Sequence, residues 1–224
     1  MVCIGGLELN RTVIAAIGED PVHSARKAKQ LGADILELRI DLLSQNPLEI
    51  LEELKKLEIP IIITNRMKDQ GGSWNGSEED RIRELLLLLP VADAVDIELC
   101  AHDRDMIVRE ARNIGKTVII STHDFQRTPD NRVMNEIIKG SLEAGADIAK
   151  LAVMPGSLFD VLRLLEVTYS AKGQVCTIAM GALGNHSRII APLYGSLMTY
   201  GYVDTPTAPG QFRIDELKNM LKMF

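Results

Sequence analysis

The segment Leu31-Gly-Ala-Asp-Ile-Leu-Glu37 recurs later in the chain as Ala144-Gly-Ala-Asp-Ile-Ala-Lys150. Each copy has the features of a helix end, a tight turn at glycine and the start of an apolar strand. Val91-Ala-Asp-Ala-Val-Asp96 is a fainter third copy. The repetition predicts that helices and strands alternate along the chain, and that Glu37, Asp96 and Lys150 occupy equivalent positions on three strands.

Short apolar runs continue this alternation over the whole chain. They are rich in isoleucine and valine and apolar on both faces, which is typical of strands in a covered parallel sheet. The runs are Thr12–Ile17, Ile35–Ile40, Ile59–Thr64, Ala94–Leu99, Thr117–Ser121, Ile148–Val153, Val175–Met180 and the weaker Thr199–Val203. Between them, Asp20-Pro21, Asn46-Pro47, Ser77 and Ser157 predict the starts of helices, and Asp20 and Asn46 are expected to cap theirs, each before a proline at the first helical position.

This order of elements predicts an α/β protein, a single (β/α)8 TIM barrel with eight parallel strands, in which residues 1–224 form one catalytic domain. The length of 224 residues suits such a barrel, which needs roughly 200 to 250 residues. The alternative is an open doubly wound sheet, which usually carries a Gly-rich nucleotide loop. Neither G-x-G-x-x-G nor G-x-x-x-x-G-K-[ST] occurs in the chain, so the closed barrel is favoured.

Composition limits the classes of partner. A net charge of -6 argues against binding to nucleic acid or to an anionic membrane. The longest apolar run, residues 85–92, is too short to span a bilayer. Cys3, Cys100 and Cys176 are far apart and form no C-x-x-C pair, which indicates reduced thiols. We therefore expect a cytoplasmic protein with a small-molecule substrate and no nucleic-acid or membrane partner.

Charged residues occur within strands that should be apolar. Glu37 and Arg39 share one face of their strand, and Asp96 shares a face with Glu98 in the same way. Burying a charge costs several kcal/mol unless the charge is paired. Catalytic groups of barrel enzymes come from the carboxyl ends of several strands. The pattern predicts an active site, and the alternative is a buried ion-pair network that only holds the strands in register.

Lys150 and His123 indicate the chemistry. Burial disfavours the charged form of a lysine, and a neutral amine is the nucleophile that forms an imine with a ketone. The alternatives for Lys150 are an ion pair with Glu37 or a side chain that extends to the barrel rim. His123 ends the preceding strand and can carry a proton near neutral pH, although it could also be a core histidine. No partner at metal spacing lies near His102, so no metal site is expected.

Two loops are suited to binding a ligand. Arg188 follows the Gly-rich stretch 181–184 and can begin a helix, whose free N–H groups favour anions. Residues 205–211 are rich in proline and glycine and could form a lid over the barrel mouth or a rigid connection.

Taken together, the stretches that carry these residues resemble the type I 3-dehydroquinate dehydratase family. The order and spacing of the stretches match the family through nearly the whole chain. The stretches are Glu37-Leu-Arg39-Ile-Asp41, Thr64-Asn-Arg66 with Gly71-Gly72, Asp96-Ile-Glu98-Leu99, Ser121-Thr-His123-Asp-Phe125, Ala149-Lys150-Leu-Ala-Val-Met-Pro155, Met180-Gly181 with Ser187-Arg188, and Ala208-Pro-Gly-Gln211.

The resemblance implies dehydration of 3-dehydroquinate to 3-dehydroshikimate in the shikimate pathway by a metal-free, cofactor-free homodimer. It implies that Lys150 forms a Schiff base and that His123 is the general acid/base of a syn elimination. Asp96 would orient His123 from behind. The implied substrate-binding residues are Glu37, Arg39, Arg66, Arg188, Thr207 and Gln211, with Arg188 holding the substrate carboxylate.

The chain departs from the family pattern at three positions. Ala15 replaces a serine in the first strand, Asp69 or Gln70 replaces a glutamate after Arg66, and Thr207 replaces a serine while keeping the hydroxyl. Two other functions are compatible with these residues. One is a different Schiff-base barrel, a lyase or aldolase that acts on a sugar phosphate. The other is a non-catalytic barrel that binds a carboxylic acid through Arg188 and Arg66.

Overall fold

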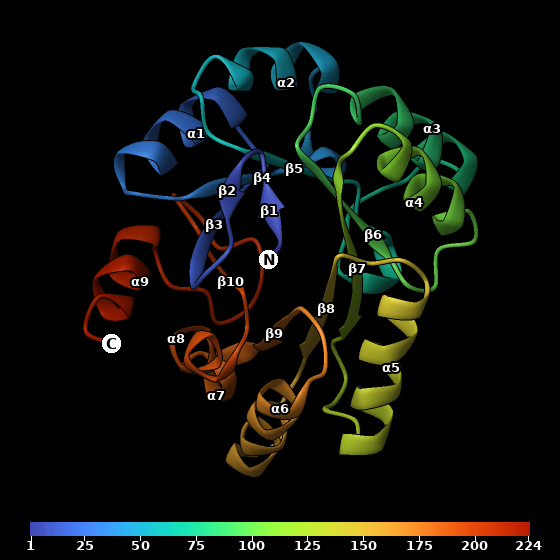
Figure 1. Ribbon diagram of the computed structural model, residues 1–224. Coiled ribbons are helices and arrows are strands. Elements are labelled where there is room, and N and C mark those ends of the chain that lie inside the picture. The colour runs from blue at the N-terminus through green and yellow to red at the C-terminus, as the bar shows by residue number, and fades with distance from the viewer.

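The computed structural model describes residues 1–224, and eight parallel strands form its central barrel (Figure 1). The strands are β3 (Thr12–Ile17), β4 (Ile35–Arg39), β5 (Ile61–Thr64), β6 (Ala94–Glu98), β7 (Thr117–Asp124), β8 (Ile148–Val153), β9 (Val175–Ala179) and β10 (Met198–Gly201). Their order around the sheet is β10-β3-β4-β5-β6-β7-β8-β9. The predicted TIM barrel is therefore confirmed, with β3 and β8 at the predicted residues and the bounds of the other strands shifted by one to three residues.

The barrel closes between β9 and β10. The Leu197 N–H donates to the Val175 carbonyl at 2.8 Å, and Val175 and Ser196 form a parallel bridge just before β10 begins. This seam is shorter than the ladders between the other strands, because it has one bridge where the other neighbouring strands share three or more residue pairs.

The repeated Asp of the three related segments explains why the strands align. Asp34 Oδ2 accepts the backbone N–H of Val13, the second residue of the preceding strand, at 2.8 Å. Asp147 accepts from Val118 in the same way at 2.8 Å, and Asp93 accepts from Ile61 at 2.9 Å. Each aspartate thus supplies an acceptor at the amino-terminal end of a neighbouring strand and helps to set its register.

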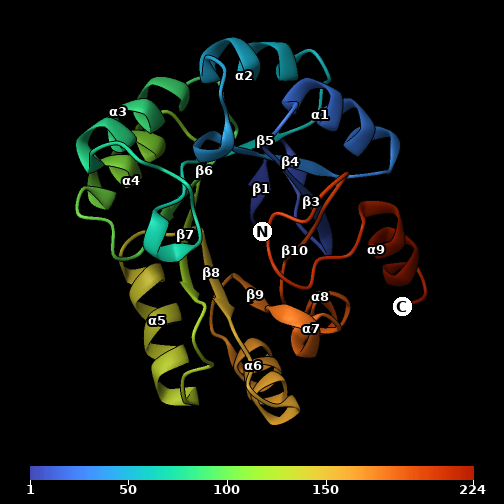
Figure 2. The ribbon, with the colours of Figure 1, turned by 180° about the vertical axis from the view of Figure 1, so that it is seen from behind.

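Helices cover the outside of the barrel in both views (Figures 1 and 2). They are α1 (Pro21–Gln30), α2 (Pro47–Lys55), α3 (Glu78–Leu88), α4 (Arg104–Asn113), α5 (Asn131–Glu143), α6 (Leu158–Ser170), α7 (Gly181–Gly184), α8 (Ser187–Ile190) and α9 (Ile214–Leu221). Three short 3-10 helices, η1 (Ile40–Leu42), η2 (Lys68–Gln70) and η3 (Ala191–Tyr194), complete the connections. β9, the seventh strand of the barrel, is followed by three short helices, α7, α8 and η3, rather than by one long helix. No helix is both long and apolar enough to cross a bilayer.

Three of the four predicted helix starts carry a side-chain cap. Asn46 accepts the Leu48 N–H, Ser77 accepts the Asp80 N–H, and Ser157 forms a reciprocal capping box with Asp160. The prediction of a cap at Asp20 was wrong. Asp20 precedes α1, but its backbone is left-handed at φ +42° and its side chain caps no N–H.

A short hairpin packs against the end of the barrel at which the strands begin, here called the lower end. It consists of β1 (Cys3–Ile4) and β2 (Leu7–Glu8), and Ile4 and Leu9 join the apolar cluster that fills this end of the interior. The Thr117 hydroxyl, at the start of β7, donates to the Cys3 carbonyl at 2.6 Å. The carboxyl-terminal ends of the strands, on the opposite side, are left for the site.

Candidate active site

A cavity opens at the carboxyl-terminal ends of the strands and encloses about 520 Å³, including the part that is open to solvent. Most of the site residues predicted from the sequence line it. These are Glu37, Arg39, Arg66, His123, Lys150, Arg188, Thr207 and Gln211. Asp96 is the exception. It lies beneath the cavity, 1 % exposed, in contact with Lys150 and Arg66.

Lys150 is a buried lysine inside β8, with 4 % of its surface exposed. Its Nζ donates to Asp96 Oδ2 at 2.8 Å and lies 3.5 Å from Glu37 Oε1. The Tyr200 ring centroid lies 4.1 Å from the same nitrogen, at a distance where the negative face of the ring attracts a cation. The ion pair with Glu37 considered from the sequence is therefore present but long, and the side chain does not extend to the rim.

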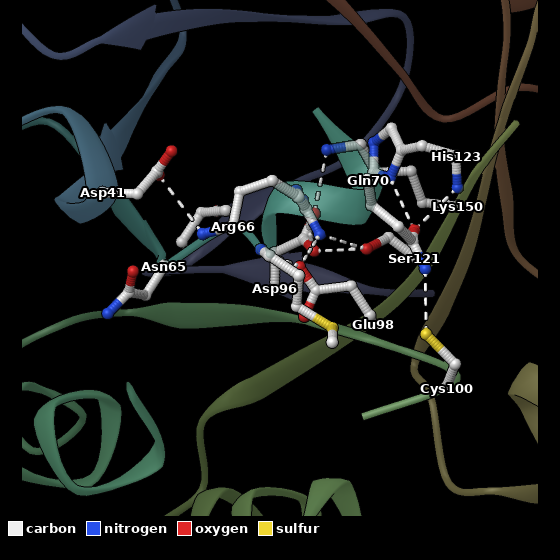
Figure 3. A network of polar contacts seen from close by, with 12 residues as sticks. Asp41, Asn65, Arg66, Gln70, Asp96, Glu98, Cys100, Ser121, His123 and Lys150 are labelled. Atoms are coloured by element: carbon white, nitrogen blue, oxygen red, sulfur yellow. Dashed lines mark hydrogen bonds and ion pairs between the residues drawn. The ribbon is translucent and has the colours of Figure 1, made fainter. Parts of the chain in front are cut away.

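Arg66 connects the buried charges below the cavity (Figure 3). Its guanidinium donates to Asp96 Oδ1 at 2.7 Å, to Glu98 Oε1 at 2.8 Å and to the Ser121 hydroxyl at 2.7 Å. Ser121 in turn donates to Asp96 Oδ1 at 2.6 Å. The second oxygen of Glu98 accepts from Arg81 at 2.8 Å. Every buried carboxylate of this network therefore has a cationic partner, which offsets the cost of removing it from water.

These cations keep Asp96 ionised. Burial alone would raise the pKa of Asp96, but Arg66 and Lys150 outweigh it and hold this pKa well below its usual 3.8. The sequence indicated Glu98 only as a neighbour of Asp96 on one strand face. It gave no indication that Ser121 and Arg81 complete the network, because a small hydroxyl in a strand and an arginine in a helix are common everywhere.

His123 lies near the carboxyl end of β7 and is stacked on Phe125, with ring centroids 6.4 Å apart and planes inclined by 19°. Burial lowers the pKa of His123 well below the ordinary 6.5, and the positive charges of Arg66 and Lys150 lower it further. A pKa near neutral was expected from the sequence. The structure instead favours a neutral imidazole, which is the form that accepts a proton.

The expected contact between Asp96 and His123 is absent. Asp96 instead accepts hydrogen bonds from Lys150, Arg66 and Ser121, and these three donors occupy both of its oxygens. Gln70 holds His123 instead. Its Oε1 accepts the His123 backbone N–H at 2.8 Å and lies 3.2 Å from His123 Nδ1. Sequence reasoning noted Gln70 only as a departure from the family pattern and assigned it no role.

Arg188 is a buried cation without a carboxylate partner. Its guanidinium donates only to the backbone carbonyls of Gly210, Tyr200 and Pro209, at 2.9, 3.1 and 3.1 Å. Burial lowers its pKa to about 10, so it stays charged at neutral pH. A cation that is 1 % exposed and lacks a counter-ion at the edge of a cavity can bind an anion without first breaking an ion pair.

Arg39 contributes to the cavity wall from the end of β4. Its guanidinium makes two hydrogen bonds to Asp41, at 2.8 and 2.7 Å. Asp41 also accepts the backbone N–H groups of Arg66 and Ser73, at 3.2 and 3.0 Å. Burial raises the pKa of Asp41, but Arg39 and these N–H groups outweigh it and leave the pKa below its usual 3.8. Asp41 therefore fixes both the arginine and the loop after β5.

The loop after β10 brings Thr207 and Gln211 to the cavity. Gln211 Oε1 accepts the N–H groups of Thr207 and Ala208, at 2.8 and 3.1 Å, which folds the loop on itself. Gly210 has φ +74°, and a Cβ there would lie 2.3 Å from the Gly181 carbonyl oxygen. Only glycine fits this close approach of two loops. No group of three or more His, Cys, Asp or Glu side chains could hold a metal ion.

The chain is similar to a family of enzymes over nearly its whole length. The model of the family described as Type I 3-dehydroquinase matches residues 13–224. The 3-dehydroquinate dehydratase of Methanococcoides burtonii is 49 % identical, over 97 % of this chain and 96 % of that protein. That of Methanosarcina barkeri is 48 % identical over 100 % and 99 %.

Solved structures give the same result. The 3-dehydroquinate dehydratase of Geobacillus kaustophilus superposes with a TM-score of 0.93 at 28 % identity, covering 99 % of this chain and 95 % of that one. The type I 3-dehydroquinate dehydratase of Clostridium difficile, solved with covalently modified comenic acid, has a TM-score of 0.92 at 30 % identity, covering 99 % and 96 %.

Proposed function

The chain belongs to the type I 3-dehydroquinase family and is a hydro-lyase that dehydrates 3-dehydroquinate in the shikimate pathway, and we propose that Lys150 and His123 carry out this dehydration through a Schiff base. The observation that carries the proposal is the placement of Lys150. A lysine amine buried at the base of a cavity, with Arg188 as an unpaired cation in the same cavity wall, suits a ketone that also carries a carboxylate.

Imine formation is the first step. Lys150 gives up one proton so that its neutral amine can attack the ketone carbon, and that proton is returned to the hydroxyl of the adduct, which leaves as water and gives a protonated imine. Asp96, held ionised by Arg66, accepts a hydrogen bond from the lysine nitrogen before the reaction. The positive charge of the imine forms above the face of Tyr200 and beside Asp96, where both partners stabilise a cation.

Proton transfer follows at the adjacent carbon. His123 removes a proton from the carbon next to the imine, and the electron pair forms an enamine with the cation as the electron sink. The enamine then expels the β hydroxyl, which leaves as water with the proton returned by His123, in a syn elimination. One water hydrolyses the imine and frees Lys150, so the water lost in imine formation is recovered and the net reaction releases one water. General acid/base transfer contributes roughly 10²–10⁴-fold.

Substrate binding uses the remaining cavity residues. Arg188 binds the carboxylate, because its charge has no protein carboxylate to neutralise it. Glu37, Arg39, Thr207 and Gln211 line the same cavity, and we assign them to the hydroxyl groups of the substrate. Arg66 is proposed to act mainly through the protein, because three of its hydrogen bonds already go to Asp96, Glu98 and Ser121.

Borohydride trapping tests the proposal. The protein is mixed with 3-dehydroquinate and borohydride, and its intact mass is measured before peptide mapping. We expect a mass gain of one reduced adduct on the peptide that contains Lys150. The Lys150→Met protein should show no adduct, no turnover and an intact fold by circular dichroism. Turnover by a folded Lys150→Met protein, or an adduct on another residue, would contradict the Schiff-base assignment.

No observation favours the sugar-phosphate lyase or the non-catalytic binding protein over the dehydratase. The homodimer and the cytoplasmic location stay predictions from the sequence. Light scattering on the purified protein tests the first, and fractionation of cells tests the second.

A further inference from the structure

A chain of hydrogen bonds runs from the surface to His123 through Gln70 (Figure 3). Gln70 ends η2 and lines the cavity beside His123, and only 9 % of it is exposed. Its Nε2 donates to the thiol of Cys100 at 3.0 Å. Cys100 directly follows Leu99 after β6 and is exposed to solvent. Three residues from three neighbouring strand ends, none of them adjacent in sequence, are thereby joined in a fixed order.

The orientation of the Gln70 amide follows from the donors around it. The backbone N–H of His123 can only donate, and it lies 2.8 Å from the Gln70 side chain, so the atom facing it must be the oxygen Oε1. The amide nitrogen then points the other way, where the Cys100 sulfur is its acceptor. The reverse orientation would bring two N–H groups together at His123, where neither could accept.

This orientation decides which ring nitrogen of His123 carries the proton. The same Oε1 lies 3.2 Å from Nδ1 and has no hydrogen to donate, so Nδ1 must carry one. The groups that act on the ring charge are Arg66, Lys150 and Arg39, which disfavour the imidazolium, and Asp96, which favours it. With the three cations dominant, the imidazole is neutral, and its lone pair is at Nε2.

We propose that Gln70, held in orientation by Cys100, is a positioning residue that fixes the Nδ1-protonated tautomer of His123 and so presents Nε2 as the base. The inference rests on the proposed role of His123. A neutral amide performs this task differently from a carboxylate: it orients the ring and selects the tautomer without adding a negative charge that would raise the basicity of His123. The three cations nearby therefore keep their full influence on the imidazole.

Nitrogen-15 NMR of the histidine side chains in the substrate-free protein tests the tautomer directly. The chain has four histidines, and comparison with the His123→Gln protein assigns the His123 signals. We expect Nδ1 of His123 to be protonated and Nε2 to be unprotonated at neutral pH. A signal pattern with the proton on Nε2, or a mixture of both tautomers, would overturn the inference. Because no substrate is present, this result is independent of whether the Schiff-base proposal holds.

Variants of Gln70 separate tautomer selection from simple packing. Gln70→Met keeps the size but removes the acceptor, and it should allow the second tautomer and lower kcat by about tenfold or more while borohydride still traps the adduct. Gln70→Glu keeps the acceptor and adds a charge, so it should retain the tautomer and move the titration of His123 to higher pH. A Gln70→Met protein with the wild-type tautomer would contradict the proposal.

Variants of Cys100 test the outer end of the chain. Cys100→Ala removes the acceptor for Gln70 Nε2 and should lower kcat by about two- to fivefold with KM unchanged, a modest loss because a thiol is a weak acceptor. Cys100→Ser replaces it with a hydroxyl acceptor and should restore most of the lost kcat. Cys3→Ala removes the other exposed cysteine, at the far end of the barrel, and is the matched control. Equal kcat in Cys100→Ala and wild type would remove Cys100 from the proposal.

Discussion

The two ends of the barrel interior are made by the same strands but have opposite chemistry. At the lower end, the inward side chains are apolar and fully or almost fully buried. They are Ile14, Ile35, Ile62, Ala94, Ile119, Ile148, Cys176 and Met198. Two residues further along five of these strands, the inward positions are taken by Glu37, Thr64, Asp96, Ser121 and Lys150. A step of two keeps a side chain on the same face of a strand, so one pattern builds both layers.

The difference shows how a barrel divides stability from chemistry. The lower layer can fill space without polar partners, and the amino-terminal hairpin adds Ile4 and Leu9 to it. The upper layer holds buried charges that must be paired one by one, and Lys150 is held within reach of both Asp96 and Glu37. A buried ion-pair network is often no more stabilising than an apolar core. We therefore expect changes in the upper layer to act mainly on catalysis and changes in the lower layer to act mainly on stability.

After Lys150→Met, which should abolish turnover, the largest effect is expected for His123→Gln in the upper layer. Turnover should fall by roughly 10²–10⁴-fold, because the proton carrier is lost, while the Lys150 amine remains. Borohydride should still trap the adduct by intact mass, which separates imine formation from proton transfer. Loss of the adduct together with turnover would show that His123 is needed before the imine forms.

Arg188→Met should weaken binding of the substrate carboxylate. We expect KM to rise by roughly 10- to 100-fold, on the scale of a lost buried charge contact, and kcat to change less. Steady-state kinetics give both constants. Arg83 is a highly exposed arginine paired only with Asp80, and Arg83→Met is therefore a matched control that should leave KM unchanged. Equal KM in the wild-type and Arg188→Met proteins would contradict the anion-binding role of Arg188.

Acid should destabilise the protein through His123. Its pKa in the folded protein lies well below 6.5, so between these two values the unfolded chain binds a proton that the folded protein does not. The free energy of unfolding should therefore decrease as pH falls below about 6.5, by up to ~1.4 kcal/mol per pH unit, until the folded pKa is reached. Urea unfolding at several pH values measures this slope. His123→Gln should reduce it, and His102→Gln, on an exposed side chain, should not.

The smallest effect on catalysis is expected for Ile148→Val in the lower layer. Loss of one buried methylene should cost about 0.5–1.5 kcal/mol of stability and leave kcat/KM unchanged. Ile178→Val is the companion variant, because Ile178 lines the cavity. Urea unfolding and steady-state kinetics are measured on both proteins. If Ile148→Val lowers kcat/KM as much as Ile178→Val does, the two layers are not independent.

Local sequence features predicted most of the fold correctly. The apolar runs marked all eight strands, and β3 and β8 begin and end at the predicted residues. The same reasoning failed at the start of α1. Asp20 was expected to cap α1, but its backbone is left-handed there and its side chain caps no N–H.

The site was only partly predictable. The alternation of strand faces predicted that Lys150, Glu37 and Asp96 lie in one layer, and the residues assigned to substrate binding line one cavity. The partner of each charge could not be read from the sequence. Asp96 was assigned to His123 but contacts Lys150, 54 positions away, and Gln70 had no assigned role although it holds His123, 53 positions away.

The sequence by itself determined the periodic features: eight strands, the face on which each charge lies, and the presence of a lysine in an apolar strand. These follow from residue spacing and from the cost of exposing apolar side chains, both of which are local. Only the tertiary structure decided that Arg188 has no counter-ion, that Asp96 serves Lys150, and that Gln70 sets the hydrogen bonding of His123. Hydrogen bonds depend on distances of a few tenths of an ångström between strands far apart in sequence, and closing the barrel is what sets those distances.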